Sequence, residues 1–111
     1  MEESVGRMSE FFKALSDPTR LKIIRLLASN PERSLCVGAV AQRLGITQPA
    51  VSQHLRVLKH VGLVEPNREG FRVHYTINKK TLTELRKDMD ELYRLASEQC
   101  AYNGECQNHT E

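Results

Sequence analysis

The chain lacks tryptophan, has few aromatic residues and contains no long apolar run. Of its 111 residues, 40% are hydrophobic and only 5% are aromatic, which favours a small helical domain over a β-sandwich. No segment approaches the roughly 18 apolar residues that a membrane span needs. The acidic, polar start MEESVGRMSE also has no apolar signal-peptide core. We therefore expect one soluble, cytoplasmic domain with no membrane partner.

Neither sign of charge is in large excess, and cysteine is scarce. The formal charge is +2, so a nucleic-acid partner has to be argued from where the charges lie. The cysteines, Cys36, Cys100 and Cys106, cannot all pair within one chain, and a reducing cytosol keeps them as thiols. Reduced cysteines serve buried packing, redox chemistry or metal binding.

The first half of the chain reads as short helices separated by capping signals. Apolar residues between positions 5 and 15 recur three and four apart, which predicts a first helix. Asp17-Pro18 supplies an N-cap and a first-turn proline, so a second helix starts there and ends before Pro31. We predict a third helix over residues 35–44, which Gly45 ends in a left-handed conformation.

The segment ITQPAVSQHLRVLKHVGLV is the most informative stretch. Thr47 is a plausible N-cap with Pro49 in the first turn, and Val51, Leu55 and Leu58 share one apolar face. The outward face carries amide, hydroxyl and cationic groups and no carboxylate. A solvated helix face usually carries both signs of charge, whereas a DNA-facing one must not repel phosphates.

Two short helices joined at Gly45-Ile46-Thr47 form a helix-turn-helix pattern, in which the start of the second helix reaches base edges in the major groove. An ordinary helical hairpin is the alternative. The candidate DNA-binding residues on this helix are Thr47, Gln48, Ser52, Gln53, Arg56 and Lys59. From their side-chain chemistry, we expect Gln48, Ser52 and Gln53 at bases and Arg56 and Lys59 mainly at phosphates.

A change of period after the helix-turn-helix predicts a β-hairpin. Residues 71–77 alternate between apolar and polar types, which is typical of a half-buried strand. Residues 63–65 supply its partner, and residues 67–70 the turn. The hairpin would be the wing of a winged helix, with Arg68 and Arg72 at phosphates or in the minor groove unless they are merely solvated.

The last segment predicts a helix from about Lys80, with a narrow apolar seam through Leu85 and Leu92. The first and last helices have more apolar face than one small core can cover, so we expect them to form a dimer interface. Two recognition helices about 34 Å apart would then match a palindromic operator. The expected fold is mainly α with a β-hairpin wing: residues 1–98 form a winged-helix DNA-binding and dimerisation domain, and residues 99–111 a cysteine-containing tail.

The motifs LSDPTRLKIIRLLA, LCVGAVAQRLGITQPAVSQHLRVLKHVGLV and REGFRVHYTI, in this order and spacing, resemble the ArsR/SmtB family of winged-helix repressors. The resemblance runs from about Phe11 to Ile77 and continues in the last helix. It implies a homodimer that represses its own operon and leaves DNA when an inducer, commonly a metal or metalloid ion, binds. It implies no cofactor for DNA binding itself.

The family's known metal-ligand positions are compared with this chain residue by residue, to narrow down which inducer it binds. The family's Cys-Val-Cys site corresponds here to Cys36-Val37-Gly38, so half of the pair is missing. At the positions of the family's zinc ligands, this chain has residues that do not bind zinc: Lys79, Thr81, Leu92 and Leu95. The tail EQCAYNGECQNH resembles the C-terminal cysteine cluster of some arsenic-sensing members. Three thiolates, from Cys36, Cys100 and Cys106, suit arsenic(III) or another thiophilic ion, and His109 would complete a tetrahedral site.

Several alternatives stay open at this stage. Cys36 could be a buried core residue and the tail cysteines incidental. A disulfide or polysulfide bridge would make the protein a redox or persulfide sensor, and zinc or another soft metal would make it a sensor of that metal. A DNA-binding protein without any ligand is a further possibility. A thiol enzyme using Cys106 with His109 is remote, since no oxyanion hole or enclosed pocket is predicted. We expect no enzymatic activity.

Overall fold

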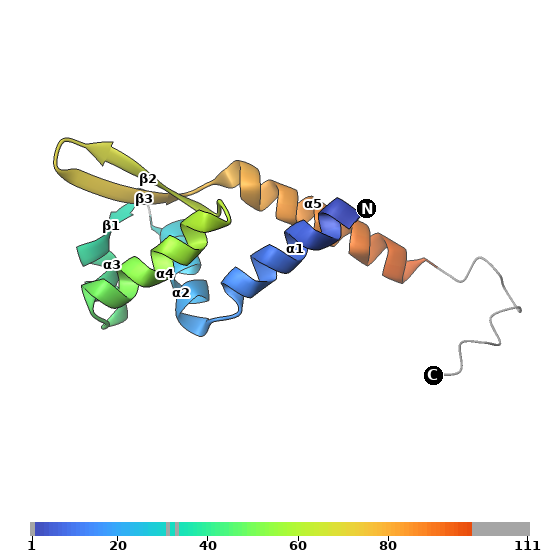
Figure 1. The fold of residues 1–111 in the computed structure, drawn as a ribbon, viewed down its shortest axis with the longest axis horizontal. Coiled ribbons are helices and arrows are strands. Elements are labelled where there is room, and N and C mark those ends of the chain that lie inside the picture. Colours follow the sequence, from blue (N-terminus) through green and yellow to red (C-terminus); the bar gives the residue numbers. More distant parts are fainter. Residues whose placement is uncertain (1, 31, 33, 99–111) are drawn as a thin grey trace, which may run out of the picture.

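The computed structural model describes residues 2–30, 32 and 34–98 as helices around a small sheet (Figure 1). The elements in chain order are α1 (Glu2–Leu15), α2 (Pro18–Ser29), β1 (Leu35–Cys36), α3 (Val37–Leu44), α4 (Gln48–His60), β2 (Val64–Glu69), β3 (Arg72–Ile77) and α5 (Lys79–Ser97). The mainly α class with a β-hairpin wing is confirmed. The predicted tail, residues 99–111 with Cys100 and Cys106, lies outside the described residues.

Local capping signals fix the start of α2, the end of α3 and the start of α4 as predicted. The Asp17 carboxylate accepts a hydrogen bond of 3.1 Å from the Arg20 backbone N–H at the start of α2. The Thr47 hydroxyl accepts one of 3.3 Å from the Ala50 N–H at the start of α4. Gly45 ends α3 at φ 70°, a left-handed conformation that glycine adopts without steric cost.

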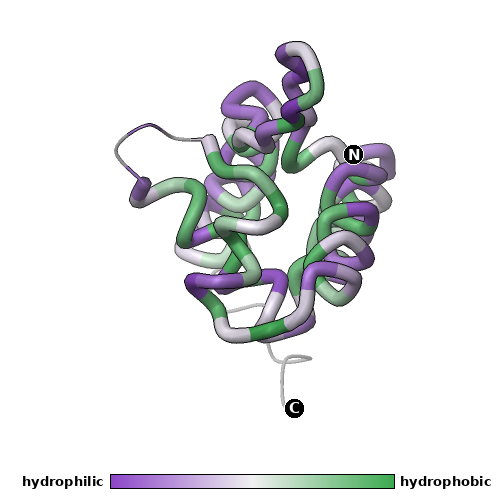
Figure 2. The backbone as a smooth tube through the Cα atoms, turned by 90° about the vertical axis from the view of Figure 1, so that its left-hand side faces the viewer, coloured by the Kyte–Doolittle hydropathy of each residue, from purple (hydrophilic) through white to green (hydrophobic). Residues whose placement is uncertain are grey.

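The apolar face of α4 forms the centre of the core. Val51, Leu55 and Leu58 are at most 1% exposed, which confirms the predicted inward face. Apolar and polar stretches alternate along the helices when the molecule is viewed from the wing end (Figure 2). The other buried apolar residues come from α1, α2, β1, α3, β2, α5 and the link before β2, and they are Phe11, Ala14, Ile23, Leu27, Leu35, Val40, Ala41, Leu63, Val64 and Leu85. The core therefore fixes α4 and leaves its outer face free.

The sheet has the antiparallel order β1-β3-β2, and its first strand was not predicted. Leu35 and Cys36 lie opposite Tyr75 and His74 of β3, so α3 starts at Val37 and not at Leu35. The two-residue strand gives the edge of β3 a hydrogen-bonding partner. Its pairing is with residues almost forty positions away, which no local pattern reveals.

The hairpin turn is shorter than predicted and lies further along the chain. β2 and β3 pair from Val64 opposite Ile77 to Glu69 opposite Arg72, so the turn consists of Gly70 and Phe71 alone. Residues 67–69, predicted as part of the turn, belong to β2. Phe71, predicted in a half-buried strand, is fully exposed at 102%. Alternation predicts burial only where another layer covers the strand.

Helices α1 and α5 contact each other and together leave apolar side chains uncovered (Figure 1). In α1, Phe11 is buried, whereas Val5 and Phe12 are about half exposed. In α5, Leu85 is buried and Leu92 is 50% exposed. Both helices thus have an inward face and a second apolar face that the protomer does not cover. Among the described helices, none is long and apolar enough to cross a membrane.

Candidate nucleic-acid interface

The outer face of α4 and the wing present the predicted DNA-binding side chains to solvent. Every one of them is exposed: Thr47, Gln48, Ser52, Gln53, Arg56, Lys59, Arg68 and Arg72. The sequence has no Asp or Glu between Glu32 and Glu65, so α3, α4 and the turn between them carry no carboxylate. This acid-free surface suits a polyanion.

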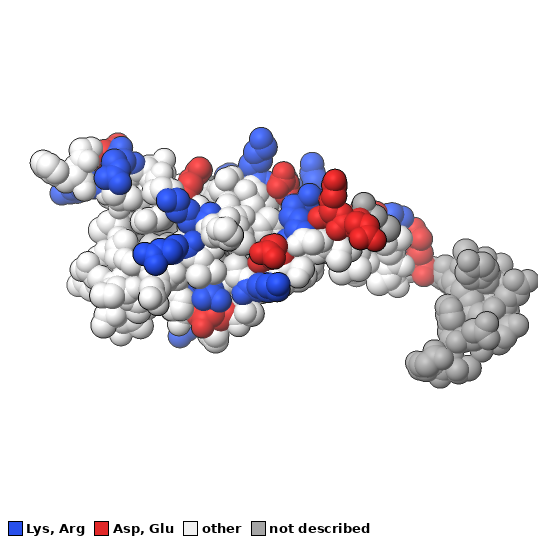
Figure 3. Space-filling view, in the orientation of Figure 1, with Lys and Arg blue, Asp and Glu red and all other residues white. Residues whose placement is uncertain are grey.

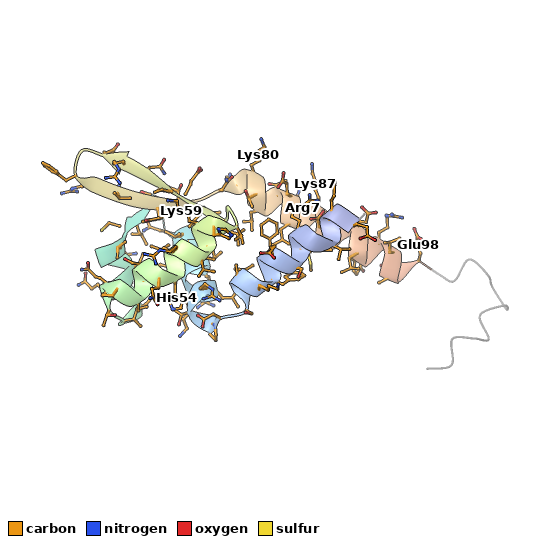
Figure 4. All side chains as sticks on the ribbon, viewed as in Figure 1. Arg7, His54, Lys59, Lys80, Lys87 and Glu98 are labelled. Atoms are coloured by element: carbon orange, nitrogen blue, oxygen red, sulfur yellow. The ribbon has the colours of Figure 1, made fainter. Side chains whose placement is uncertain are left out.

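On the face that Figure 3 shows, cations lie over α4, the wing, α1 and α5, whereas most acidic groups lie over α1 and α5. Lys59 projects from α4, as does the half-buried His54 (Figure 4). The candidate interface is therefore set apart by its lack of acidic groups and not by an excess of cations. The wing is the exception, because it carries Glu65 and Glu69 beside its arginines.

Gln48 differs from the other polar residues of α4 in its surroundings. Its Nε2 atom lies 3.4 Å from where a Cβ at Gly38 would stand, so its side chain packs against the start of α3. Ser52 and Gln53 lie one turn further along α4 and are exposed. A Cβ at position 38 would meet the Gln48 amide at van der Waals distance.

A polar network holds α4 against the junction of α1 and α2. The Arg20 guanidinium donates to the backbone carbonyls of Ala14 and Lys13, and its Nη1 lies 3.4 Å from Nδ1 of His54. A carboxylate oxygen of Asp17 lies 3.9 Å from the same ring nitrogen. His54 is thus engaged in holding the recognition helix. Sequence reasoning missed Arg20, since nothing local distinguishes it from a solvated cation.

The base of the wing is tied directly to the end of α4. The Leu63 N–H donates to the Leu58 carbonyl at 3.0 Å, and the Leu63 carbonyl accepts from the Asn78 N–H at 2.9 Å. Leu63 and Val64 are both 1% exposed. The wing and the recognition helix therefore share one buried anchor and keep their relative positions.

Of the predicted metal ligands, the described structure contains Cys36 alone. Cys36 is partly buried at the N-cap of α3, opposite His74 of β3. Cys100, Cys106 and His109 lie outside the described residues. Within the part of the chain that the structure describes, no cluster of three or more His, Cys, Asp or Glu residues has the arrangement of a metal site.

A charged pair fastens α1 to α5. Nε and Nη2 of Arg7 donate to the two carboxylate oxygens of Asp88, each at 2.9 Å (Arg7 is labelled in Figure 4). These hydrogen bonds hold the pKa of the Asp88 carboxyl below its ordinary value. Sequence reasoning missed this pair, because its members are 81 positions apart. The pair borders a hollow whose apolar lining comes from Val5, Met8, Leu92 and Leu95.

Comparison with known proteins places this geometry in a family. The family model described as "Bacterial regulatory protein, arsR family" matches residues 17–66. An uncharacterised HTH-type transcriptional regulator of Methanocaldococcus jannaschii, MJ1325, is 41% identical over 81% of this chain and 99% of its own length. The arsenical resistance operon repressor of Escherichia coli is 36% identical over 80% of this chain and 74% of its own. This chain belongs to the ArsR family.

Solved structures of ArsR-like proteins have the same winged helix. HlyU from Vibrio cholerae superposes with a TM-score of 0.67 at 34% identity, over 88% of this chain and all of that one. Mb0332 from Mycobacterium bovis, a homodimeric winged helix-turn-helix domain, superposes with a TM-score of 0.61 at 30% identity. The match covers 87% of this chain and 83% of that one. The ArsR family consists of transcriptional regulators, so the helix-turn-helix interpretation is confirmed and the thiol-enzyme alternative is wrong.

Proposed function

We propose that this ArsR-family chain is a homodimeric repressor that binds operator DNA through α4 and the wing and leaves it when arsenic(III) binds cysteine thiolates. The observation that carries the DNA-binding part is the exposed, carboxylate-free outer face of α4. A helix of this polarity, held firmly by a buried apolar face, can enter a major groove without repelling phosphates.

The side chains of this surface divide by chemistry. We assign Ser52 and Gln53, in the N-terminal half of α4, to base edges, where Gln bonds well to adenine and Ser to several bases. Thr47 caps the helix. We propose that Gln48, whose side chain lies beside Gly38 of α3, contacts DNA from that position. We assign the phosphate contacts to the exposed cations Arg56, Lys59, Arg68 and Arg72.

The apolar hollow between α1 and α5 is proposed as the dimer interface. Val5 is 58% exposed, Leu92 50% and Leu95 44%, an arrangement that costs free energy unless another surface covers it. The homodimeric state of Mb0332 supports this assignment. A second copy would bring a second α4 into place about 34 Å away for a palindromic operator.

Arsenic(III) is proposed as inducer because the arsenical resistance repressor is similar over most of this chain and because three thiolates suit a pyramidal ion. Cys36 lies at the wing end of the protomer, while α5 runs away from the sheet (Figure 1). This helix has 19 residues and therefore spans about 28 Å from Lys79 to Ser97. We therefore propose that the tail pair, Cys100 and Cys106, binds arsenic(III) together with the Cys36 thiolate of the other protomer.

The test titrates fully reduced protein with arsenite without oxygen and follows the ultraviolet thiolate-to-arsenic band. The proteins compared are wild type, Cys36→Ser, Cys100→Ser and Cys106→Ser. Each is also assayed for release from a DNA duplex that the wild-type protein has selected from a random-sequence library. We expect a saturating band at one ion per protomer, weakened by every substitution, and release that follows it. Absence of the band in wild type would exclude arsenic(III) as the inducer.

Mixed dimers decide between sites within and across protomers. Cys36→Ser protomers are mixed with Cys100→Ser/Cys106→Ser protomers and allowed to exchange. If the site spans the interface, the mixed dimer regains one complete site and part of the band returns. If the site lies within one protomer, no mixed dimer contains a complete set, and the band stays absent.

A second candidate keeps the same DNA-binding protein and replaces the ion with sulfur chemistry. HlyU, which is similar to this chain, has been solved in a form described as reduced, which favours a thiol oxidation switch as the alternative. Thiolates close enough to share an ion are also close enough to form a disulfide or polysulfide bridge. Mass spectrometry after persulfide treatment would detect the bridge, and zinc or cadmium added in place of arsenite would test the remaining metal alternatives.

A further inference from the structure

The most exposed large apolar side chain among the described residues lies at the tip of the wing. Phe71 is 102% exposed, against 75% for Tyr93 and 58% for Val5. It occupies the second position of a two-residue turn whose first residue, Gly70, has φ 63°. Scattered exposed apolar residues are ordinary, but this one stands at the point of the molecule that extends furthest from the core along the hairpin (Figure 1).

The tip is held in a defined place. Six residue pairs connect β2 with β3, from the buried Val64 to Glu69 beside the turn. The Asn67 side chain also donates to the Thr76 hydroxyl at 3.1 Å across the strands. Because Leu63 bonds both the end of α4 and the end of β3, Phe71 has a fixed position relative to the recognition helix.

Two arginines lie on either side of the tip. Arg68 is paired with Val73 and Arg72 with Glu69, and since neighbouring pairs of an antiparallel ladder point to opposite faces, the two guanidinium groups project from opposite faces of the hairpin. A minor groove is bordered by two phosphate strands. The tip has one arginine on each face, and Glu69 shares a face with Arg72. An exposed apolar end between two arginines matches a minor groove better than it matches a protein partner.

We propose that Phe71 inserts into the minor groove beside the major groove entered by α4, and that its ring partly unstacks one base step there. Apolar side chains inserted in this way kink the duplex and allow it to contact more protein surface. Pyrimidine–purine steps, above all TA, unstack most easily. The wing thereby adds sequence preference without any hydrogen bond to a base. This inference rests on the proposed DNA-binding function.

The experiment uses the full chain and a duplex that wild-type protein enriches from a random-sequence library. Single adenines under the wing are replaced in turn by 2-aminopurine, whose fluorescence rises on unstacking. Phe71→Ser removes the apolar side chain, and Phe71→Leu keeps an apolar one as the matched control. Circular dichroism verifies that both variants fold, as expected for a side chain with no buried contact.

We expect the 2-aminopurine fluorescence at one base step to rise on binding of wild type and of Phe71→Leu, but not of Phe71→Ser. The affinity of Phe71→Ser for the duplex should fall by about tenfold or more. Replacement of that step by a stiff A-tract should weaken wild type and leave Phe71→Ser unaffected. Equal affinity and equal fluorescence for Phe71→Ser and wild type would overturn the wedge while leaving DNA binding intact. Failure of wild type to enrich any duplex would instead refute the DNA-binding function, and the wedge with it.

Discussion

Removal of one proposed phosphate contact from the α4 helix of each protomer should change the salt dependence of DNA binding by a calculable amount. Arg56 is exposed on the face of α4 that carries no carboxylate. A dimer with Arg56, Lys59, Arg68 and Arg72 at phosphates has two copies of each. Since each contact contributes about 0.9 to the slope of log K against log salt concentration, the wild-type slope should be about −7.

Arg56→Gln removes two of these contacts from the dimer, so the slope should become less steep by about 1.8. A fourfold rise in salt concentration, which weakens wild type by about 10⁴-fold, should then weaken the variant by only about 10³-fold. Fluorescence anisotropy of a labelled duplex, measured over a series of salt concentrations, gives both slopes. The enriched duplex of the previous experiment serves as the probe.

Two control variants make the result specific. Arg56→Lys keeps the charge and should keep the slope. Lys87→Gln removes an exposed cation from α5, away from α4 (Figure 4), and should leave both slope and affinity unchanged. If Arg56→Gln weakens binding without changing the slope, the residue contacts a base instead. If it changes neither, α4 does not face the phosphates as proposed.

The remaining predictions concern the helix cap, the dimer face and the α1–α5 pair. Thr47→Ala removes the hydroxyl that caps α4 and should lower the free energy of unfolding by about 1 kcal/mol in urea titrations; no loss would mean that the cap is dispensable. Leu92→Lys places a charge in the uncovered apolar hollow and should yield a folded monomer by light scattering; a persisting dimer would place the interface elsewhere. The pKa of Asp88 is lowered by Arg7, so this stabilisation is complete above the ordinary carboxyl pKa and is lost as pH falls through the lowered one. Thermal melts of wild type and Asp88→Asn should therefore converge in acid, and a difference that stays constant at every pH would contradict the role of the pair.

Local chemistry made much of the recognition unit predictable. Asp17, Gly45 and Thr47 act on backbone groups within three or four residues, and the structure shows these caps where the sequence indicates them. The apolar face through Val51 and Leu55 follows from helical spacing alone, and both residues are buried. Because one face of α4 is fixed in the core, the exposure of the other face follows directly.

Only the tertiary structure decided what depends on partners distant in the sequence. Leu35 and Cys36 become a strand because β3 offers them an edge, and Phe71 loses its expected burial because the hairpin extends beyond any covering layer. The Arg7–Asp88 pair and the contact of Arg20 with His54 join segments that no periodicity relates. The sequence by itself determined which residues form the helix proposed to face DNA, since helices and caps are local. The fold alone decided where the wing turns and which charges meet, because these depend on how the chain packs.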